Sequence, residues 1–272
     1  MAQYNVNSAD YEIDRDFFEE FDAFEGKTIG RGSSGMVVLA TSFEEPYVQR
    51  AVKKFALHGI HTDDEEAEED STVIRNFFKE VSIMRRVSNT NIMPLIASVK
   101  TPFYLAIVMP YCPKGDLSRL LVELSTSDQQ KYSRQITTAV EYLHSKNIIH
   151  GDLKPLNVLI DEHDNALVSD FGLSRAVPNK TVEIFMNFGT MSYRAPETFL
   201  AERVNPFKAD LYSLGVTLWA IALKKKPKKW MDYVEEITSA SHLPPFTRTV
   251  IVSLLNTDPK KRPNASQILE DL

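Results

Sequence analysis

The sequence predicts an α+β fold in which strand patterns occupy the first part of the chain and helical patterns the rest. Over residues 26–52 the pattern is strand, glycine turn and two further strands, and another β-type run covers residues 104–109. Helical patterns begin at Leu117 and dominate the chain beyond Pro196. Strands followed by helices, rather than alternating with them, are typical of α+β proteins.

The first half of the chain divides into several expected elements. Residues 14–24 carry four phenylalanines among acidic residues and read as a short amphipathic helix that leads into the first strand. The acidic block at residues 63–70 is expected to be a mobile loop, because like charges repel and the block lacks apolar anchors. A helix is expected over residues 73–87, and strands over 92–97 and 104–109.

The second half is expected to be mainly helical. Residues 111–117 contain a proline and a glycine and form the most plausible junction between two lobes. Helices are expected over residues 117–124 and 128–146. Pro259 and Pro263 bracket a turn before a last helix.

The composition restricts the class of protein and its partners. The 272 residues are 43% hydrophobic and 25% charged, as in ordinary globular proteins. A net charge of −6 argues against direct binding to nucleic acid and leaves a basic protein substrate open. No apolar run is long enough to span a bilayer, so no membrane association is expected. The single cysteine, Cys112, excludes an intrachain disulfide framework and favours an intracellular location, in the cytoplasm or the nucleus.

Five short signatures follow one another in a fixed order. They are Gly30-Arg31-Gly32-Ser33-Ser34-Gly35-Met36-Val37, Ala51-Val52-Lys53, His150-Gly151-Asp152-Leu153-Lys154-Pro155-Leu156-Asn157, Asp170-Phe171-Gly172 and Ala195-Pro196-Glu197. A glycine loop alone says little, whereas the joint occurrence at workable distances is a strong signal. In this order the chain resembles a eukaryotic-type protein kinase of the serine/threonine class, from about Phe24 to its last residues.

The resemblance implies a two-lobed kinase fold with a specific division of the chain. Residues 1–23 would be an N-terminal extension, and residues 24–112 would form the first lobe, with an antiparallel five-stranded sheet and one important helix. Residues 113–272 would form the mainly helical second lobe. The implied reactants are ATP, Mg²⁺ and a protein substrate.

The phosphate site is expected on the first lobe. Gly30, Gly32 and Gly35 lack side chains, so their backbone N–H groups can approach anionic oxygens closely. Lys53 lies eighteen positions beyond Gly35, so two antiparallel strands can bring its ammonium beneath the loop, and the resemblance implies that it holds the α- and β-phosphates. Glu80 is the expected ion-pair partner of Lys53, because three apolar residues lie within about 100° of it on the predicted helix.

A short strand–loop–strand segment that contains Asp152 is expected to hold most of the catalytic groups. The resemblance implies that Asp152 accepts the proton of the substrate hydroxyl and that Lys154 neutralises the transferring phosphoryl group. It also implies that Asn157 and Asp170 hold Mg²⁺. Lys154 and Thr190 resemble the serine/threonine class more than the tyrosine class.

The adenosine site is likewise implied by the resemblance. Its expected residues are Val37, Ala51 and Leu159 around the ring, Met109 at the gatekeeper position, Pro110 and Cys112 in the hinge, and Asp116 at the ribose. Pro110 has no N–H and can only accept a hydrogen bond through its carbonyl, whereas the amide of Cys112 can donate. Without the neighbouring motifs, each of the apolar residues would also fit a plain core.

Two further matches concern the stability of the second lobe. Glu197 and Arg262 resemble the buried pair that ties the activation segment to the helices. Asp210 resembles the carboxylate that braces the catalytic loop.

The chain departs from the common kinase pattern at Gly151, where many protein kinases carry arginine. That arginine usually meets a phosphate on the activation loop, so its absence removes one half of a charge-assisted switch. The sequence therefore predicts activity without activation-loop phosphorylation. Replacing Ser174 and Thr181 by alanine is expected to leave the rate nearly unchanged.

Three other interpretations of the catalytic motifs are open. The loop around Asp152 also resembles small-molecule kinases that phosphorylate antibiotics or choline, whereas residues 170–172 and 189–197 match the peptide-binding platform of protein kinases. A pseudokinase scaffold is weakened because the catalytic residue types are all present. A compact domain with a short activation segment and Gly151 is also similar to virus-encoded kinases, including those of baculoviruses.

Substrate preference and regulation are less sharply indicated. Kinases that prefer basic substrates carry glutamates where this chain has Leu156 and Ala220, so only Asp116 remains of three acidic anchors. Phe78 lies about 200° from Glu80 on the predicted helix and should point away from the active site.

Three arrangements are open for the surface around Phe78. Residues 18–21 resemble an FxxF motif that docks against this helix in some kinases, so they would cover Phe78 in the same or a neighbouring chain. A homodimer centred on the helix is the second arrangement. In the third, the N-terminal phenylalanines only anchor the first strand.

Overall fold

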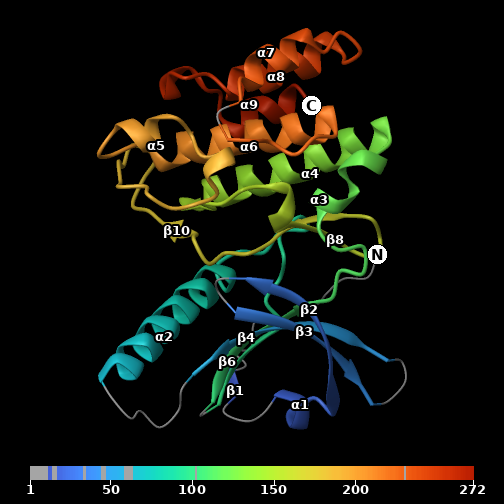
Figure 1. The fold of residues 1–272 in the computed structure, drawn as a ribbon, viewed down its shortest axis with the longest axis vertical. Coiled ribbons are helices and arrows are strands. Elements are labelled where there is room, and N and C mark those ends of the chain that lie inside the picture. The colour runs from blue at the N-terminus through green and yellow to red at the C-terminus, as the bar shows by residue number, and fades with distance from the viewer. Residues whose placement is uncertain are drawn as a thin grey trace. The chain divides into compact units, whose positions relative to one another are not determined.

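The computed structural model describes residues 12–13, 17–32, 35–43, 47–57, 64–101, 103–229 and 231–272. The chain forms two compact units (Figure 1). The first comprises Met1–Ser88 and Met93–Cys112, and the second comprises Asn89–Ile92 and Pro113–Leu272. Within the described part of the chain, no helix has the length and apolar character needed to cross a membrane.

The first unit is built on a sheet with the strand order β1-β5-β6-β4-β3-β2. The strands are β1 (Glu12–Ile13), β2 (Ala23–Gly32), β3 (Gly35–Ser42), β4 (Gln49–Ala56), β5 (Ala97–Lys100) and β6 (Tyr104–Pro110). The five strands from β2 to β6 pair in antiparallel fashion, which confirms the predicted five-stranded sheet. The two-residue strand β1 adds a parallel pairing with β5 that the sequence did not predict.

The strand predicted over residues 92–97 is wrong. Regular pairing begins only at Ala97, and Ile92 forms an isolated bridge with Val168 instead. Pro94 lies between them and has no N–H to donate to a strand ladder, so it interrupts the pattern that the apolar residues suggest.

The helix of the first unit, α2 (Asp64–Met84), begins earlier than predicted. The acidic block was expected to be a mobile loop, but from Asp64 onward it forms the first turns of α2, and Asp70 is buried. Carboxylates near a helix N-terminus interact favourably with the helix dipole, and glutamate has a good helix propensity. Asp63 lies outside the described residues.

The two faces of the sheet carry different layers. On β4, Lys53 and Phe55 face α2, and the ring of Phe55 meets that of Phe77 edge-on at 5.6 Å. Since successive strand residues point to opposite faces, Val52 and Lys54 lie on the other face. That outer face carries a cluster of buried small apolar residues, namely Val38, Ala40, Val52, Ala97, Val99, Ala106 and Val108.

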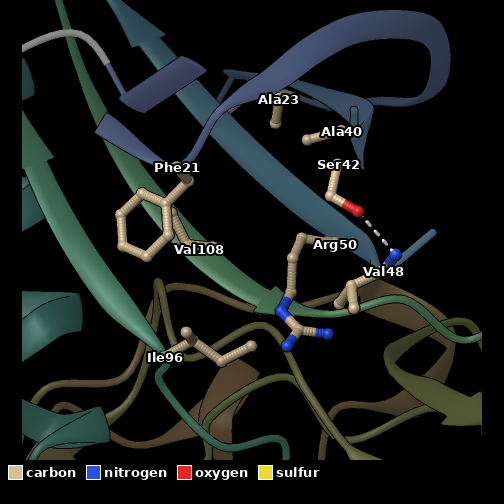
Figure 2. Close-up of a pocket in the computed structure, with 8 residues that line it drawn as sticks. All are labelled: Phe21, Ala23, Ala40, Ser42, Val48, Arg50, Ile96 and Val108. Carbon is tan, nitrogen blue, oxygen red and sulfur yellow. Dashed lines mark hydrogen bonds between the residues drawn. The ribbon is translucent and has the colours of Figure 1, made fainter. Parts of the chain in front are cut away.

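The N-terminal phenylalanines lie on this outer face. The helix α1 (Phe17–Glu20) is a single turn, shorter than predicted, and Phe18 packs against the outer cluster. Phe21 lines a pocket of about 140 Å³ on the same face, in which Figure 2 shows its ring beside Val108. Docking of residues 18–21 onto Phe78 within the same chain is therefore wrong, because α2 covers the opposite face of the sheet. Docking onto Phe78 of a neighbouring chain stays a prediction. The alternative that these residues anchor the first strand agrees with the structure.

The second unit is mainly helical, as predicted. Its longer helices are α4 (Thr126–Ser145), α6 (Pro206–Leu223), α7 (Tyr233–Ser239) and α8 (Pro245–Leu254), with the short helices α3 (Leu117–Leu120), α5 (Glu197–Leu200) and α9 (Ala265–Glu270). A 3₁₀ turn over Leu121–Glu123 continues α3, and a second one over Pro259–Lys261 forms the predicted turn before α9. In Figure 1, α6 runs beside α4 with α8 next to it.

Four short strands flank loops in the described part of the second unit. They are β7 (Ile148–Ile149), β8 (Val158–Ile160), β9 (Ala166–Val168) and β10 (Arg175–Ala176). The hairpin of β8 and β9 follows the loop that contains Asp152, and β10 pairs with β7 just before that loop. These pairings fix both ends of residues 150–157.

Candidate active site

A buried ion pair lies on the inner face of the first unit. Nζ of Lys53 is 2.8 Å and 2.9 Å from the two carboxylate oxygens of Glu80. Both residues are buried, so each charge depends on the other for compensation. The ion pair expected from the helix face of Glu80 is present.

The glycine loop joins β2 to β3, and β3 pairs with β4, the strand that carries Lys53. Gly30 pairs with Val37 and Gly32 with Gly35, and Val37 in turn pairs with Lys53. Gly35 has a φ of +136°, and a Cβ at this position would overlap the carbonyl oxygen of Lys54. Glycine is therefore required at the end of the turn. Ser33 and Ser34 lie outside the described residues.

The residues assigned to the adenosine site occupy both units. In the first unit Ala51 and Met109 are register partners on adjacent strands, Pro110 ends β6, and Cys112 is buried. In the second unit Asp116 forms a bridge with Leu159.

The carboxylate of Asp116 is already engaged within the second unit. It lies 2.9 Å from Nε of Arg119 and accepts a hydrogen bond from the hydroxyl of Ser118. The remaining acidic anchor is therefore already paired with a cation of its own chain.

Three side chains meet in the loop between β7 and β8. Nζ of Lys154 is 2.5 Å from Oδ2 of Asp152 and 2.6 Å from Oγ1 of Thr190. The backbone N–H of Thr190 donates to Oδ1 of Asp152 at 2.7 Å. The structure thus brings together three residues that the sequence predicted for catalysis, although Thr190 lies 38 positions beyond Asp152.

Asp152 is held in its ionised form. Burial alone would raise the pKa of its carboxyl, but the hydrogen bond and charge of Lys154, together with the hydrogen bonds of Thr190, outweigh burial and lower the pKa below its ordinary value. Asp152 is therefore a carboxylate at neutral pH, which is the form that can accept a proton.

A backbone hydrogen bond joins the two segments that carry the residues assigned to Mg²⁺, Asn157 and Asp170. The N–H of Ser169, next to Asp170, donates to the carbonyl of Asn157 at 2.8 Å. Nδ2 of Asn157 donates to the carbonyl of Asp152 at 2.9 Å, which fixes the amide. Asp170 has an exposed side chain and a φ of +62°. One amide oxygen and one carboxylate suit Mg²⁺, which prefers oxygen ligands and completes its shell with water and phosphate oxygens.

Asp210 on α6 braces the catalytic loop from below. Its carboxylate accepts hydrogen bonds from the backbone N–H groups of His150 at 2.7 Å and Gly151 at 2.9 Å, and it lies 3.1 Å from Nε2 of His144. Burial would raise its pKa, but these contacts, first of all that of His144, lower it. The predicted bracing role is confirmed by these bonds.

Glu197 and Arg262 form the predicted pair. Their two parallel hydrogen bonds measure 2.6 Å and 2.7 Å, and Arg262 also donates to the carbonyls of Asn256 and Lys208. Arg262 is almost completely buried. The bidentate pair therefore ties α5, at the end of the activation segment, to the turn before α9.

Two residues of this site were not recognised from the sequence. Ser174 is fully buried, and its hydroxyl donates to the carbonyl of His150 at 2.9 Å, so the expectation that Ser174→Ala leaves the rate unchanged is not supported. Gly189 has a φ of +92°, and a Cβ there would lie 2.7 Å from the carbonyl oxygen of Gly151. The available signal for Gly189 was its place at the start of the motif at residues 189–197.

Comparison with known proteins yields one family model and several relatives. Residues 24–272 match the model of the protein kinase domain. A probable serine/threonine-protein kinase of Dictyostelium discoideum is 31% identical over 74% of this chain and 23% of its own length. CBL-interacting serine/threonine-protein kinase 12 of Arabidopsis thaliana is 32% identical over 89% of this chain and 52% of its own length. The chain thus spans between about a quarter and about half of these relatives.

Proposed function

The chain belongs to the protein kinase domain family, and on that premise we propose that it transfers the γ-phosphoryl group of ATP to a serine or threonine of a protein substrate. The observation that carries this proposal is the meeting of Asp152, Lys154 and Thr190 in one hydrogen-bonded group. Such a group positions a hydroxyl acceptor beside both a base and a positive charge. Positioning and charge stabilisation supply most of the catalysis in phosphoryl transfer.

Each residue has a distinct role in the proposed reaction. Asp152 accepts the proton of the attacking hydroxyl, and Lys154 stabilises the charge on the transferring phosphoryl oxygens. Lys53, fixed by Glu80, binds the α- and β-phosphates beneath the backbone of Gly30, Gly32 and Gly35. Mg²⁺, held by Asn157 and Asp170, would neutralise phosphate charge. The adenosine assignments made above are part of the same proposal.

The test is transfer of labelled phosphate from ATP with Mg²⁺ to a mixed panel of basic and acidic proteins, followed by identification of the labelled amino acid. Lys53→Met is expected to lower kcat/KM by about 100-fold or more, because it removes a preorganised positive charge from the phosphates. Lys54→Met is the matched control, since Lys54 lies on the outer face and pairs with Glu25 at 2.9 Å. Equal activity in both variants would contradict the proposal.

Independence from activation-loop phosphorylation is a finer part of the proposal. It is supported by Gly151, which offers no guanidinium to a phosphate, and by Thr181, whose exposed hydroxyl donates to Asn179 at 2.9 Å. Thr181→Ala is expected to retain kcat within about twofold, as surface substitutions usually do. A collapse of kcat in steady-state assays of this variant would contradict it.

Partner surfaces and location remain proposals. A homodimer through α2 is supported by Ile74 and Phe78, whose exposed fractions are 37% and 40%, and the mass in solution of Phe78→Ser beside wild type tests it. A basic substrate is supported only by the net charge of −6, and the protein panel tests it. An intracellular location rests on the single cysteine, and imaging of the tagged chain in cells tests it.

A further inference from the structure

The ring of Phe188 lies between a guanidinium and the backbone of the catalytic loop. The Cζ atom of Arg175 is 4.1 Å from the centroid of the ring. On the loop side, a Cβ built on Gly151 would lie 3.0 Å from Cε2 of Phe188, so the ring edge rests on the bare backbone of Gly151. The ring also packs against the apolar cluster that includes Ile149 and Met186.

Only glycine allows this arrangement at position 151. Its φ is +82°, in the left-handed region, and a Cβ there would also lie 2.9 Å from the carbonyl oxygen of Leu173. An arginine at this position would have to displace Phe188 and change the backbone. Gly151 therefore does more than remove a phosphate-binding side chain. Because it has no Cβ, it leaves the space that the ring of Phe188 occupies.

The residues after Phe188 continue the contact with the catalytic loop. Gly189 has a positive φ and approaches the carbonyl of Gly151 so closely that a Cβ would be 2.7 Å from its oxygen. The next residue, Thr190, donates its N–H to Asp152 at 2.7 Å and accepts from Lys154 at 2.6 Å. The consecutive residues Phe188, Gly189 and Thr190 thus attach the activation segment to Asp152 and to the loop that carries Asp152.

Arg175 is fixed in place by its backbone rather than by an ion pair. It pairs with Ile149 across β10 and β7, and the preceding hydroxyl, of Ser174, donates to His150. Among the residues that the structure describes, no carboxylate pairs with Arg175, and its Nε is buried without a hydrogen-bond partner. The face of the Phe188 ring is thus the principal contact of this guanidinium, in cation–π geometry.

A second arginine secures the other end of the segment. Arg194 donates to the carbonyls of Met186 and Thr198, each at 3.0 Å, and its guanidinium lies 4.3 Å from the ring centroid of Phe199. These contacts join the residues before Phe188 to α5. The segment is therefore held at both ends by groups that carry no phosphate.

We propose that Phe188, seated between Arg175 and Gly151, is the latch that holds Thr190 against Asp152 and Lys154 and so replaces a phosphate-dependent latch. Phe188 and Arg175 are positioning residues, which act on the reaction through Thr190 and Asp152. The inference rests on the proposed function, because it describes how the same site is kept in its working arrangement.

The experiment uses the full chain, treated with phosphatase and shown by intact mass to carry no phosphate. Phe188→Ala and Arg175→Met are expected to lower kcat about 10- to 100-fold, since small misplacement of catalytic groups costs that much, while KM for ATP changes little. Arg175→Lys keeps the cation and is expected to restore most of kcat. Arg175→Met removes a buried polar atom that has no hydrogen-bond partner. The thermal midpoint of this variant should therefore stay near that of wild type even though its kcat falls.

Amide hydrogen exchange provides a readout that does not depend on activity. In Phe188→Ala and Arg175→Met, the amides of residues 188–192 are expected to exchange faster than in wild type, while those of α6 are unchanged. If wild type transfers no phosphate either with or without phosphate on its activation segment, but this pattern of exchange appears, the proposed function fails and the latch stands.

Three outcomes overturn the latch. The first is unchanged kcat and unchanged exchange in Phe188→Ala or, if that variant does not fold, in Arg175→Met. The second is a phosphate-free wild type that is inactive and gains activity when its activation segment is phosphorylated. Equal loss of kcat in Arg175→Met and Arg175→Lys, matched by an equal fall in thermal midpoint, would show a structural role alone and would also contradict the latch.

Discussion

Replacing Asp152 by asparagine is expected to lower kcat for phosphoryl transfer by about 10²- to 10⁴-fold, the range that general-base catalysis supplies. The carboxylate is the group that can accept the hydroxyl proton, and its lowered pKa keeps it ionised. Asparagine has nearly the same shape and can still accept the N–H of Thr190, but it has no charge and presents an amide to Lys154 or Thr190. Steady-state kinetics should therefore show a loss in kcat with little change in KM for ATP.

The matched control for this substitution is Asp161→Asn. Asp161 is a buried aspartate of the second unit, and it accepts hydrogen bonds from the backbone N–H and the side-chain amide of Asn165 at the turn between β8 and β9. It has no contact with Lys154 or Thr190, so kcat should stay within about twofold of wild type. Full activity of Asp152→Asn would remove Asp152 from the reaction, and equal losses in both variants would indicate general damage to the unit.

The ion pair of Lys53 and Glu80 shows what the sequence could predict. The apolar residues around Glu80 define one helix face, and the spacing of Lys53 from Gly35 places its ammonium beneath the glycine loop. Glu197 and Arg262 are different, because they lie 65 positions apart and no local pattern connects them. That pair was predicted only through the resemblance to a family whose fold is known.

The errors have physical reasons of their own. The acidic block was judged by repulsion between its charges, whereas its position at a helix N-terminus reverses that judgement. The expectation that Ser174→Ala leaves the rate unchanged took no account of burial, which is a property of the tertiary structure. The seat of Phe188 depends on the positive φ of Gly151 and on β10 placing Arg175 nearby, and neither can be read from the order of residues.

Removing the carboxylate of Asp210 is expected to have the largest effect on stability. Asp210→Ala leaves the N–H groups of His150 and Gly151, and the ring of His144, without their acceptor. Each buried donor left unsatisfied costs about 1–3 kcal/mol, and the donors of His144 and His150 are both buried, so the free energy of unfolding should fall by at least about 2 kcal/mol. Denaturant unfolding measures this loss. Asp210→Asn keeps one acceptor oxygen and should fold well enough for comparison.

The pH dependence of this effect follows from the direction of the pKa shift. The pKa of Asp210 is lower in the folded protein than its ordinary value of 3.8, so the folded state favours the ionised form. Its ionised form therefore contributes stability above about pH 4, and this contribution is lost as the pH falls through the folded pKa. The difference in unfolding free energy between wild type and Asp210→Asn should be constant between pH 7 and pH 5 and should narrow below pH 4. A difference that persists undiminished to pH 3 would mean that the charge of Asp210 does not hold the catalytic loop, and that only its shape and hydrogen bonds do.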